Sequence, residues 1–410
     1  FFNRIIESGN IPSQMKCSRV VPVPKVQNPL TPNDYRPISI QPIMLKLFEK
    51  CIIPQLNEYA DNNQLFSDCQ FGFRKLHSTS HALLTITDFI RESYENNEIC
   101  IVIACDFRKA FDRVDREVLL HKLKWYGIDT RVLESLLSER TQFVEVNGKS
   151  SAKKETLLGV AQGSSVANYF FTLMINDLPK YLEYCKCAMF ADDSTLLLSL
   201  SPKKLNELVA AVNSDMGNLN EWLVVNRMEL NVEKTEYMIC GKPAALSQCD
   251  NVIIKIGEGT LRRVYSLKIL GLIIDCNLTW DKHFNKTSSK TMYALSSIMP
   301  LKFCLSLNNR KLLASACVLP VLNYASVIWF SGGNPHKKRI DTIYRTVGRY
   351  VLLKFKYDSI SIDLTCTLEW LNCKYKYVYE VLKLYFKIKL GLCPSAFLNY
   401  CDESLFEKRS

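Results

Sequence analysis

Apolar residues follow two patterns along this chain. Continuous apolar runs predict buried strands, and apolar residues at helical spacing predict helices. The run "EICIVIACDF" (98–107) is continuously apolar and rich in β-branched residues, as in a buried strand. The segment 265–275 has a similar β character, and from about residue 290 the spacing is helical. We therefore expect a mixed α+β unit to about residue 280 and an all-α unit after it. Within the first unit, apolar positions at helical spacing predict helices over 38–59, 108–125 and 165–176, and a further helix within 201–231 whose apolar stripe runs from Leu205 to Leu223.

Turn-forming residues mark where these elements end. Prolines at positions 22, 24, 29, 32 and 37 exclude a regular helix from that part of the chain. The dipeptide Asn147-Gly148 predicts a β-hairpin. The surrounding "NGKS" is similar to the end of a phosphate-binding loop, but position 143, where that loop needs glycine, holds Phe143.

Two adjacent carboxylates interrupt an otherwise apolar stretch, "MFADDSTLLLSL" (189–200). A tight turn would hold Asp192 and Asp193 at the tip of a hairpin, where like charges repel unless a cation neutralises them. A site for divalent metal needs a further carboxylate at the end of another buried strand. Asp106 is the candidate, because it ends the buried strand described above. Aspartates at the ends of neighbouring strands suit metal-dependent phosphoryl or nucleotidyl transfer. The alternative is that Asp106 only caps the helix that follows it.

The composition narrows the class of protein. Of 410 residues, 48% are hydrophobic and 23% are charged, which is typical of a globular protein with two or three packed units. The net charge of +11 favours a polyanionic partner. Between positions 290 and 350, nine Lys/Arg stand against one acid, a net of +8 that marks a candidate nucleic-acid tract. A solvated basic face is the alternative.

Sixteen cysteines are scattered singly, without zinc-finger spacing. This pattern predicts a reduced, intracellular protein whose thiols are small core residues, Cys304 and Cys317 included. No apolar run reaches transmembrane length and no signal peptide is evident. Because the chain begins with Phe1 rather than Met, we expect it to be a fragment of a longer protein.

Three segments, in order, resemble the A, B and C motifs of reverse transcriptases from non-LTR retrotransposons, especially the jockey-like group. They are "ACDFRKAFDRVD" (104–115), "GVAQGSSVANYFFTLMINDLP" (159–179) and "FADD" (190–193). The resemblance continues in "VVPVPKVQNPLTPNDYRPISI" (20–40), "QFGFRKLHSTSHAL" (70–83), "LVVNRMELNVEKTEYM" (223–238) and "YSLKILGLIID" (265–275).

This resemblance implies an α+β right-hand polymerase fold, with an antiparallel palm sheet packed on helices and an all-α thumb or C-terminal region. It places the fingers at 1–97, with an N-terminal extension remnant. The palm, with motifs A to E and a fingers-proximal insertion, would span 98–280. The helical thumb and C-terminal region would span 281–410.

The resemblance also implies roles for individual residues. Asp106 and Asp192 would hold two Mg²⁺ ions, with Mn²⁺ a possible substitute, and the Phe107 carbonyl would be a backbone ligand. Asp193 would assist or stabilise the turn. Lys234 would be the general acid for the pyrophosphate leaving group, unless it is only an exposed lysine at a helix end.

Other residues would bind the nucleotide and the primer. Phe111 would crowd the sugar 2′ position and favour deoxynucleotides, the alternative being a core aromatic. The remaining contacts implied are Lys25 and Arg36 to the triphosphate, Gln162 and Gly163 in the nucleotide pocket, and Leu270 and Gly271 in the primer grip.

The implied activity is RNA-directed DNA polymerisation, with an RNA template, a DNA primer and deoxynucleoside triphosphates as partners and no membrane. We expect an intracellular protein, in the nucleus and in cytoplasmic ribonucleoprotein. Nothing resembles the endonuclease domain of this family, which we expect to have been lost by truncation.

Motif B departs from the family pattern, since Ala161 replaces a usual proline, and Ala167 and Asn168 replace Gly-Pro. A catalytically decayed or domesticated RNA-binding protein that keeps the fold is therefore the second hypothesis. A host polymerase of the telomerase or intron-maturase kind is the third.

Overall fold

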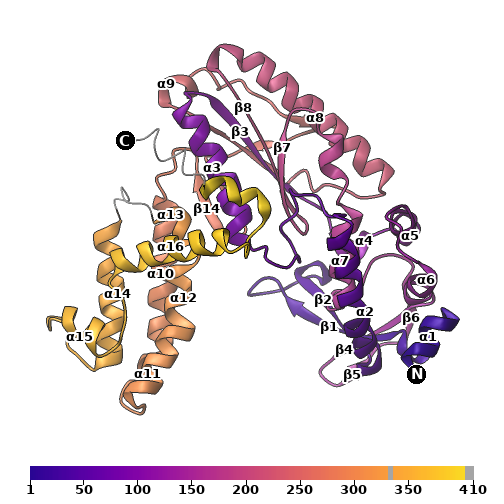
Figure 1. Ribbon diagram of the computed structural model, residues 1–410, viewed down its shortest axis with the longest axis horizontal. Coiled ribbons are helices and arrows are strands. Elements are labelled where there is room, and N and C mark those ends of the chain that lie inside the picture. Colours follow the sequence, from indigo (N-terminus) through magenta and orange to yellow (C-terminus); the bar gives the residue numbers. More distant parts are fainter. Residues whose placement is uncertain (331–335, 402–410) are drawn as a thin grey trace. The chain divides into compact units, whose positions relative to one another are not determined.

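The computed structural model describes residues 1–330 and 336–401 (Figure 1). The chain divides into two compact units. The first unit comprises Phe1–Lys75, Glu98–Tyr237 and Ser247–Arg263, and the second comprises Leu76–Asn97, Met238–Leu246 and Val264–Ser410. Each unit is therefore assembled from three separate segments of the sequence.

The first unit contains most of the strands and seven of the described helices. Its strands are β1 (Cys17–Pro24), β2 (Tyr35–Ile40), β3 (Ile99–Asp106), β4 (Thr141–Val146), β5 (Lys149–Ser150), β6 (Lys154–Glu155), β7 (Lys186–Phe190), β8 (Asp193–Leu200), β10 (Lys255–Ile256), β11 (Gly259–Thr260) and β12 (Arg262–Arg263). Its helices are α1 (Phe2–Ser8), α2 (Ile43–Asn62), α4 (Ala110–Arg113), α5 (Arg116–Trp125), α6 (Arg131–Leu137), α7 (Ser165–Met174) and α8 (Leu205–Val225). The strand β9 (Glu236–Cys240) begins in this unit, and the division between the units passes through it.

The N-terminal sheet has the strand order β2-β1-β4-β5, with β6 paired to β4. β1 and β2 are antiparallel, and β1 is parallel to β4, which follows it more than a hundred residues later. The Asn147-Gly148 turn joins β4 to β5 with positive φ at both residues, as a type I′ hairpin requires. The hairpin predicted from Asn-Gly is thus confirmed.

The second sheet has the order β12-β9-β3-β8-β7. β3 and β7 each pair antiparallel with β8, whereas the two-residue edge strand β12 is parallel to β9, a pairing that the sequence did not indicate. β3 is buried along most of its length, as its continuous apolar run predicts. The helix α8 contacts β8 through an apolar stripe that includes Leu208, Val212, Met216, Leu219 and Leu223, all buried.

The second unit is mainly helical. It contains α3 (Thr79–Glu95), α9 (Pro243–Leu246), the hairpin strands β13 (Ser266–Ile269) and β14 (Leu272–Asp275), and the helices α10 (Asp281–Ile298), α11 (Leu307–Leu313), α12 (Leu319–Asn323), α13 (Ser326–Trp329), α14 (Lys337–Leu352), α15 (Ser361–Cys366) and α16 (Cys373–Lys389). The segment 265–275 is therefore a hairpin of two strands, not one β segment.

The α+β fold class is confirmed, and the described residues from Asp281 onward form helices and no strands, as expected. Among the residues described, no helix is long and apolar enough to cross a membrane. The fourteen cysteines that the structure describes are free thiols. The expectation that they are core residues is wrong for Cys304, in the turn after Leu301, and for Cys317, in the π-helical segment Ala314–Val318, which are exposed, as are Cys51 and Cys366.

A buried carboxylate on α8 holds the chain that leads into β7. Asp215 is fully buried, and its two oxygens accept the backbone N–H groups of Glu183, Tyr184 and Cys185 at 2.8, 2.9 and 2.6 Å. These bonds replace the water that the three amides lose on burial. Asp215 thus fixes where β7 starts relative to α8.

We predict that Asp215→Ala destabilises the fold by about 3 kcal/mol, because it leaves buried amides without acceptors. The midpoint of thermal unfolding, measured by circular dichroism, should fall by roughly 5–10 °C. Glu221→Ala is the matched control, since Glu221 is an exposed carboxylate on the same helix. Equal midpoints for both variants would contradict the role given to Asp215.

Candidate active site

The two adjacent aspartates lie at the turn between β7 and β8. Phe190 and Asp193 are paired across the hairpin, so Ala191 and Asp192 form a two-residue turn. Ala191 has a φ of 55°, a conformation that costs about 1 kcal/mol or more for a residue other than glycine. Asp192 is therefore held in the turn itself, while Asp193 is the first residue of β8 and is exposed.

A contact from the segment before α3 supports this turn. The side-chain oxygen of Gln70, which is fully buried, accepts the N–H groups of Gly72 and Ala191 at 2.7 and 3.3 Å. A Cβ atom on Gly72 would lie 2.4 Å from the Ala191 nitrogen, so no other residue fits there. The segment that begins "QFGF" thus has a structural role that its resemblance alone did not reveal.

The register between β3 and β8 brings the third carboxylate to the same place. Asp106, the last residue of β3, is directly opposite Asp193. Burial raises the pKa of Asp192, and the Asp106 charge raises it further, whereas the Arg36 guanidinium lowers it. The Asp106 and Asp192 carboxylates therefore act on each other electrostatically.

A loop after α8 is fastened to the end of β3. The N–H of Arg108 donates to the Glu229 carbonyl at 2.8 Å, and the N–H of Asn231 donates to the Asp106 carbonyl at 2.7 Å. These two bonds flank an antiparallel bridge between Phe107 and Leu230. In such a pair the backbone groups of both residues point away from each other, so the Phe107 carbonyl is directed away from Leu230. Lys234 lies in the same loop with an exposed side chain.

The loop before α7 is tied to β2. The Ser39 N–H donates to the Gln162 carbonyl at 2.7 Å, and the Gln162 amide donates to Asp112 at 2.8 Å. Gly163 has a φ of 114°, and a Cβ atom there would lie 2.8 Å from the Ser39 carbonyl oxygen. Phe111 stacks on Phe171 with ring centroids 4.4 Å apart, so it also takes part in the core.

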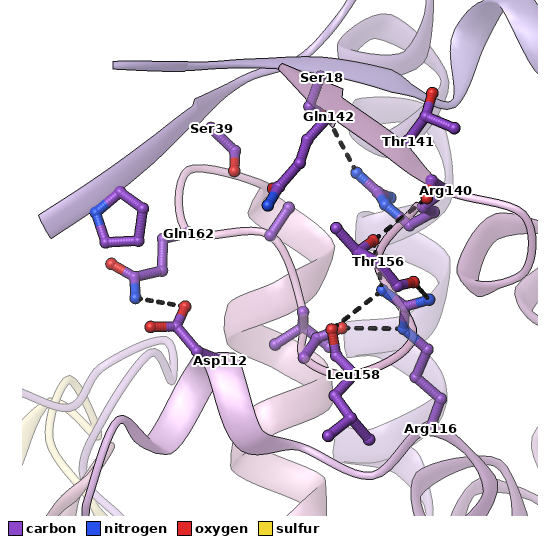
Figure 2. A pocket seen from close by; sticks show the side chains of 14 residues that line it. Ser18, Ser39, Asp112, Arg116, Arg140, Thr141, Gln142, Thr156, Leu158 and Gln162 are labelled. Carbon is purple, nitrogen blue, oxygen red and sulfur yellow. Dashed lines mark hydrogen bonds between the residues drawn. The ribbon is translucent and has the colours of Figure 1, made fainter. Parts of the chain in front are cut away.

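Figure 2 shows the cavity that this loop borders, with a volume of about 180 Å³. Arg116 donates to the carbonyls of Leu158 and Gly159, and Arg140 donates to the Ser18 hydroxyl. Burial lowers the pKa of Arg116 to about 10. The two guanidiniums thus hold the walls of the cavity, and Asp112 faces it with a pKa raised by burial.

The two predicted phosphate-binding cations lie near the β1–β2 hairpin. Arg36 is on β2, opposite Val23, and its charge acts on Asp192. Lys25 follows β1, its ammonium donates to the Asn33 carbonyl at 3.1 Å, and its charge acts on Asp112. Both side chains are exposed, but they face different acidic groups.

Ten of the twelve predicted residues belong to the first unit: Lys25, Arg36, Asp106, Phe107, Phe111, Gln162, Gly163, Asp192, Asp193 and Lys234. Leu270 and Gly271 belong to the second unit, where they form the turn between β13 and β14 with φ values of 46° and 87°. The Tyr324 hydroxyl donates to the Leu270 carbonyl at 2.5 Å.

One buried acid near the site was not predicted from the sequence. Glu49 on α2 is 1% exposed, and its carboxylate accepts the Ser164 hydroxyl at 2.8 Å and the Ser165 N–H at 3.1 Å. A carboxylate at the N-terminus of α7 is favourable because of the helix dipole. Gln41 donates to the same carboxylate at 2.9 Å. In the sequence Glu49 is one charged residue within a helical pattern, so no local signal marks it.

The described residues contain no group of three or more His, Cys, Asp or Glu side chains that could hold a metal ion. The site therefore offers the carboxylates of Asp106 and Asp192 together with the Phe107 carbonyl. This set suits a hard cation that keeps several of its ligands from water or from substrate phosphates, as Mg²⁺ does.

The chain is similar in sequence to known proteins. The chain is 27% identical over 367 residues to a probable RNA-directed DNA polymerase from transposon BS of Drosophila melanogaster, covering 85% of this chain and 40% of that protein. It is 26% identical over 352 residues to the RNA-directed DNA polymerase from mobile element jockey of the same species, covering 83% and 38%. The chain thus spans about 40% of the length of these curated relatives.

Solved structures of telomerase also align with the chain. For that of Candida tropicalis in complex with a fragment of telomeric RNA, the TM-score is 0.44 at 14% identity, over 86% of this chain and 61% of that one. The family model for the reverse transcriptase (RNA-dependent DNA polymerase) matches residues 23–274, which include every strand from β2 to β13. The chain belongs to the reverse transcriptase family.

Proposed function

We propose that this protein is the RNA-directed DNA polymerase of a non-LTR retrotransposon, which extends a DNA primer on an RNA template with deoxynucleoside triphosphates. The observation that carries the proposal is the convergence of Asp106 and Asp192 at the end of β3 and the β7–β8 turn. Relatives that bear this activity in their names match over more than four fifths of the chain. We place the protein in the nucleus and in cytoplasmic ribonucleoprotein, where its template would be.

In this proposal Asp106, Asp192 and the Phe107 carbonyl hold Mg²⁺, two ions in the full complex. When bound there, divalent metal lowers the pKa of the primer 3′-hydroxyl and neutralises charge on the triphosphate. Reverse transcriptases use divalent metal ions, and the mutual repulsion of the two aspartates is the electrostatic condition that a cation relieves.

The other residues bind and orient the substrates. Arg36 and Lys25 contact the triphosphate, with Arg36 on the side of Asp192. Gln162 and Gly163 border the nucleotide pocket, Phe111 excludes a 2′-hydroxyl, and Lys234 donates a proton to the leaving pyrophosphate. Asp193 stabilises the turn, and Leu270 and Gly271 contact the primer.

The first prediction from this proposal tests the activity. Asp192→Asn should lower primer extension on an RNA template by at least about a thousandfold, since it removes a metal ligand that supports several kcal/mol of charge stabilisation. Asp193→Asn is the matched control and should lose much less. If the wild type binds the primer–template but forms no product with Mg²⁺ or Mn²⁺, the RNA-binding hypothesis replaces this one.

A second prediction concerns stability without metal. In the presence of EDTA at pH 7.5, Asp192→Asn should raise the midpoint of thermal unfolding, because it removes a half-buried charge next to Asp106. Folding raises the pKa of Asp192, so its ionised carboxylate destabilises the folded state at neutral pH. This destabilisation disappears as the pH falls toward the ordinary pKa of 3.8, because the carboxylate becomes protonated. The gain should therefore shrink at lower pH. Asp193→Asn should change the midpoint less, and equal gains from both variants would argue against the unequal roles.

A third prediction concerns Glu49. Glu49→Gln keeps the size of the side chain but removes the charge that holds the first turn of α7, so the loop that carries Gln162 and Gly163 should be less well placed. We expect the KM for the deoxynucleotide to rise roughly tenfold, with a smaller change in affinity for the primer–template. Glu58→Gln, an equal charge change at an exposed position of α2, should leave KM unchanged. A loss of thermal stability without any change in KM would show that Glu49 has only a structural role.

A further inference from the structure

The second unit contains a cavity of about 470 Å³ that the proposed chemistry does not use. The residues that line it belong mainly to the first turns of α3, to the short helix α13 and to the C-terminal half of α16. Figure 1 labels these three helices. The guanidinium of Arg91 on α3 donates to the Ile328 carbonyl of α13 at 2.6 Å, which holds two of them together.

The N-terminus of α3 opens into this cavity. Ser78 is its N-cap, and the Ser78 side chain accepts the N–H of His81 at 3.3 Å. In a helix of 17 residues, the N–H groups of the first two positions, Thr79 and Ser80, have no acceptor within the helix. Together with the helix dipole, such amides attract an anion.

A buried histidine provides an independent sign of a ligand. His81 lines the cavity and is 7% exposed, and its Nδ1 atom has no hydrogen-bond partner among the described residues. A buried ring nitrogen without a partner is costly unless a ligand satisfies it. Burial, together with the charges of His77 and Lys387, lowers the pKa of His81 to about 4, so the ring is neutral at pH 7 and can donate one N–H.

The charged side chains at the cavity leave a positive surplus. Lys383 and Lys387 are one turn apart on α16 and both line the cavity. The acid on the same wall, Glu380, forms an ion pair with Lys376 at 2.7 Å. The ammonium groups of Lys383 and Lys387, the N-terminal residue Ser80 of α3 and the His81 ring therefore line one space.

We propose that this cavity binds a phosphate group, namely one phosphodiester of a nucleic-acid strand. The volume is that of a small-molecule site and exceeds the needs of a phosphate alone. Leu84, Ile328 and Leu384 supply an apolar wall for the attached sugar and base. The net charge of +11 suits a polyanionic ligand. The choice of nucleic acid over free phosphate rests on the proposed function.

The test measures binding of a fluorescein-labelled RNA/DNA hybrid by anisotropy, in EDTA and without deoxynucleotides, over a range of salt concentrations. Each phosphate contact adds roughly 0.7–0.9 to the slope of log Kd against log salt concentration. We expect the slope to be smaller by about this amount in Lys383→Gln and in Lys387→Gln. Lys389→Gln removes the same charge from the same helix outside the cavity lining, and its slope should equal that of the wild type. All three lysines are exposed, so the variants should fold, which thermal midpoints will verify.

A second arm follows the His81 imidazole by NMR during titration with inorganic phosphate. The chain has five histidines, and the signal that disappears in His81→Asn identifies this one. We expect the signal to shift in the wild type and to shift less in Lys387→Gln. Equal slopes for all three lysine variants would overturn the inference. If the imidazole still responds to phosphate in that case, the cavity is a site for free phosphate and not for nucleic acid.

The two proposals can fail separately. Absence of primer extension leaves these binding measurements intact, because they need neither metal nor nucleotide. Equal slopes in a protein that extends primers normally would overturn the phosphate site and leave the polymerase proposal in place.

Discussion

The pairing of β3 with β8 is the constraint on which the candidate active site depends. Eight consecutive residue pairs, from Ile99–Leu200 to Asp106–Asp193, fix the register of these two strands. Side chains alternate between the faces of a sheet and both faces of β3 are buried, so a slip of one residue would exchange the side chains of its two faces and disrupt the packing of each. The burial of residues such as Ile101, Ile103 and Leu196 prevents that slip. The hydrophobic core thereby decides where the two aspartates meet.

The charge of Asp192 in the β7–β8 turn destabilises the folded state, and neighbouring residues offset part of this cost. The Ala191 backbone is held in a left-handed conformation, and Asp192 is half-buried beside another carboxylate. Gln70 bonds the Ala191 amide, and Gly72 allows the backbone to approach it closely. Arg36 lowers part of the electrostatic cost. Under the proposed function, a turn so constrained would need little rearrangement to bind a cation and a triphosphate, which is the physical basis of preorganisation.

Local patterns in the sequence predicted those features of the site and the fold that are determined by residues close together in the sequence. The apolar run that ends at Asp106, the paired aspartates and the Asn147-Gly148 turn each carry their own signal, and each is found where it was expected. The contacts of Glu49 and Gln70 could not be predicted in this way. Glu49 reaches Ser164 across 115 positions and Gln70 reaches Ala191 across 121, and such pairings depend on the packing of whole elements. For the same reason the exposure of Cys304 and Cys317 could not be derived from their apolar neighbours.

The altered B motif is best judged by what holds its loop in this protein. A proline at the position of Ala161 would stiffen the loop by restricting its own backbone. Here the loop is instead fixed by contacts from two elements: Ser39 of β2 bonds the Gln162 carbonyl and lies against Gly163, and Glu49 of α2 bonds the start of α7. Ser164 also accepts the Ala167 N–H at 3.2 Å, so the helix keeps its N-terminal cap without Gly-Pro. The departures from the family pattern therefore change which groups hold the loop, and they do not remove its support. Decay of this motif is accordingly a weaker argument against polymerase activity than the sequence alone suggested.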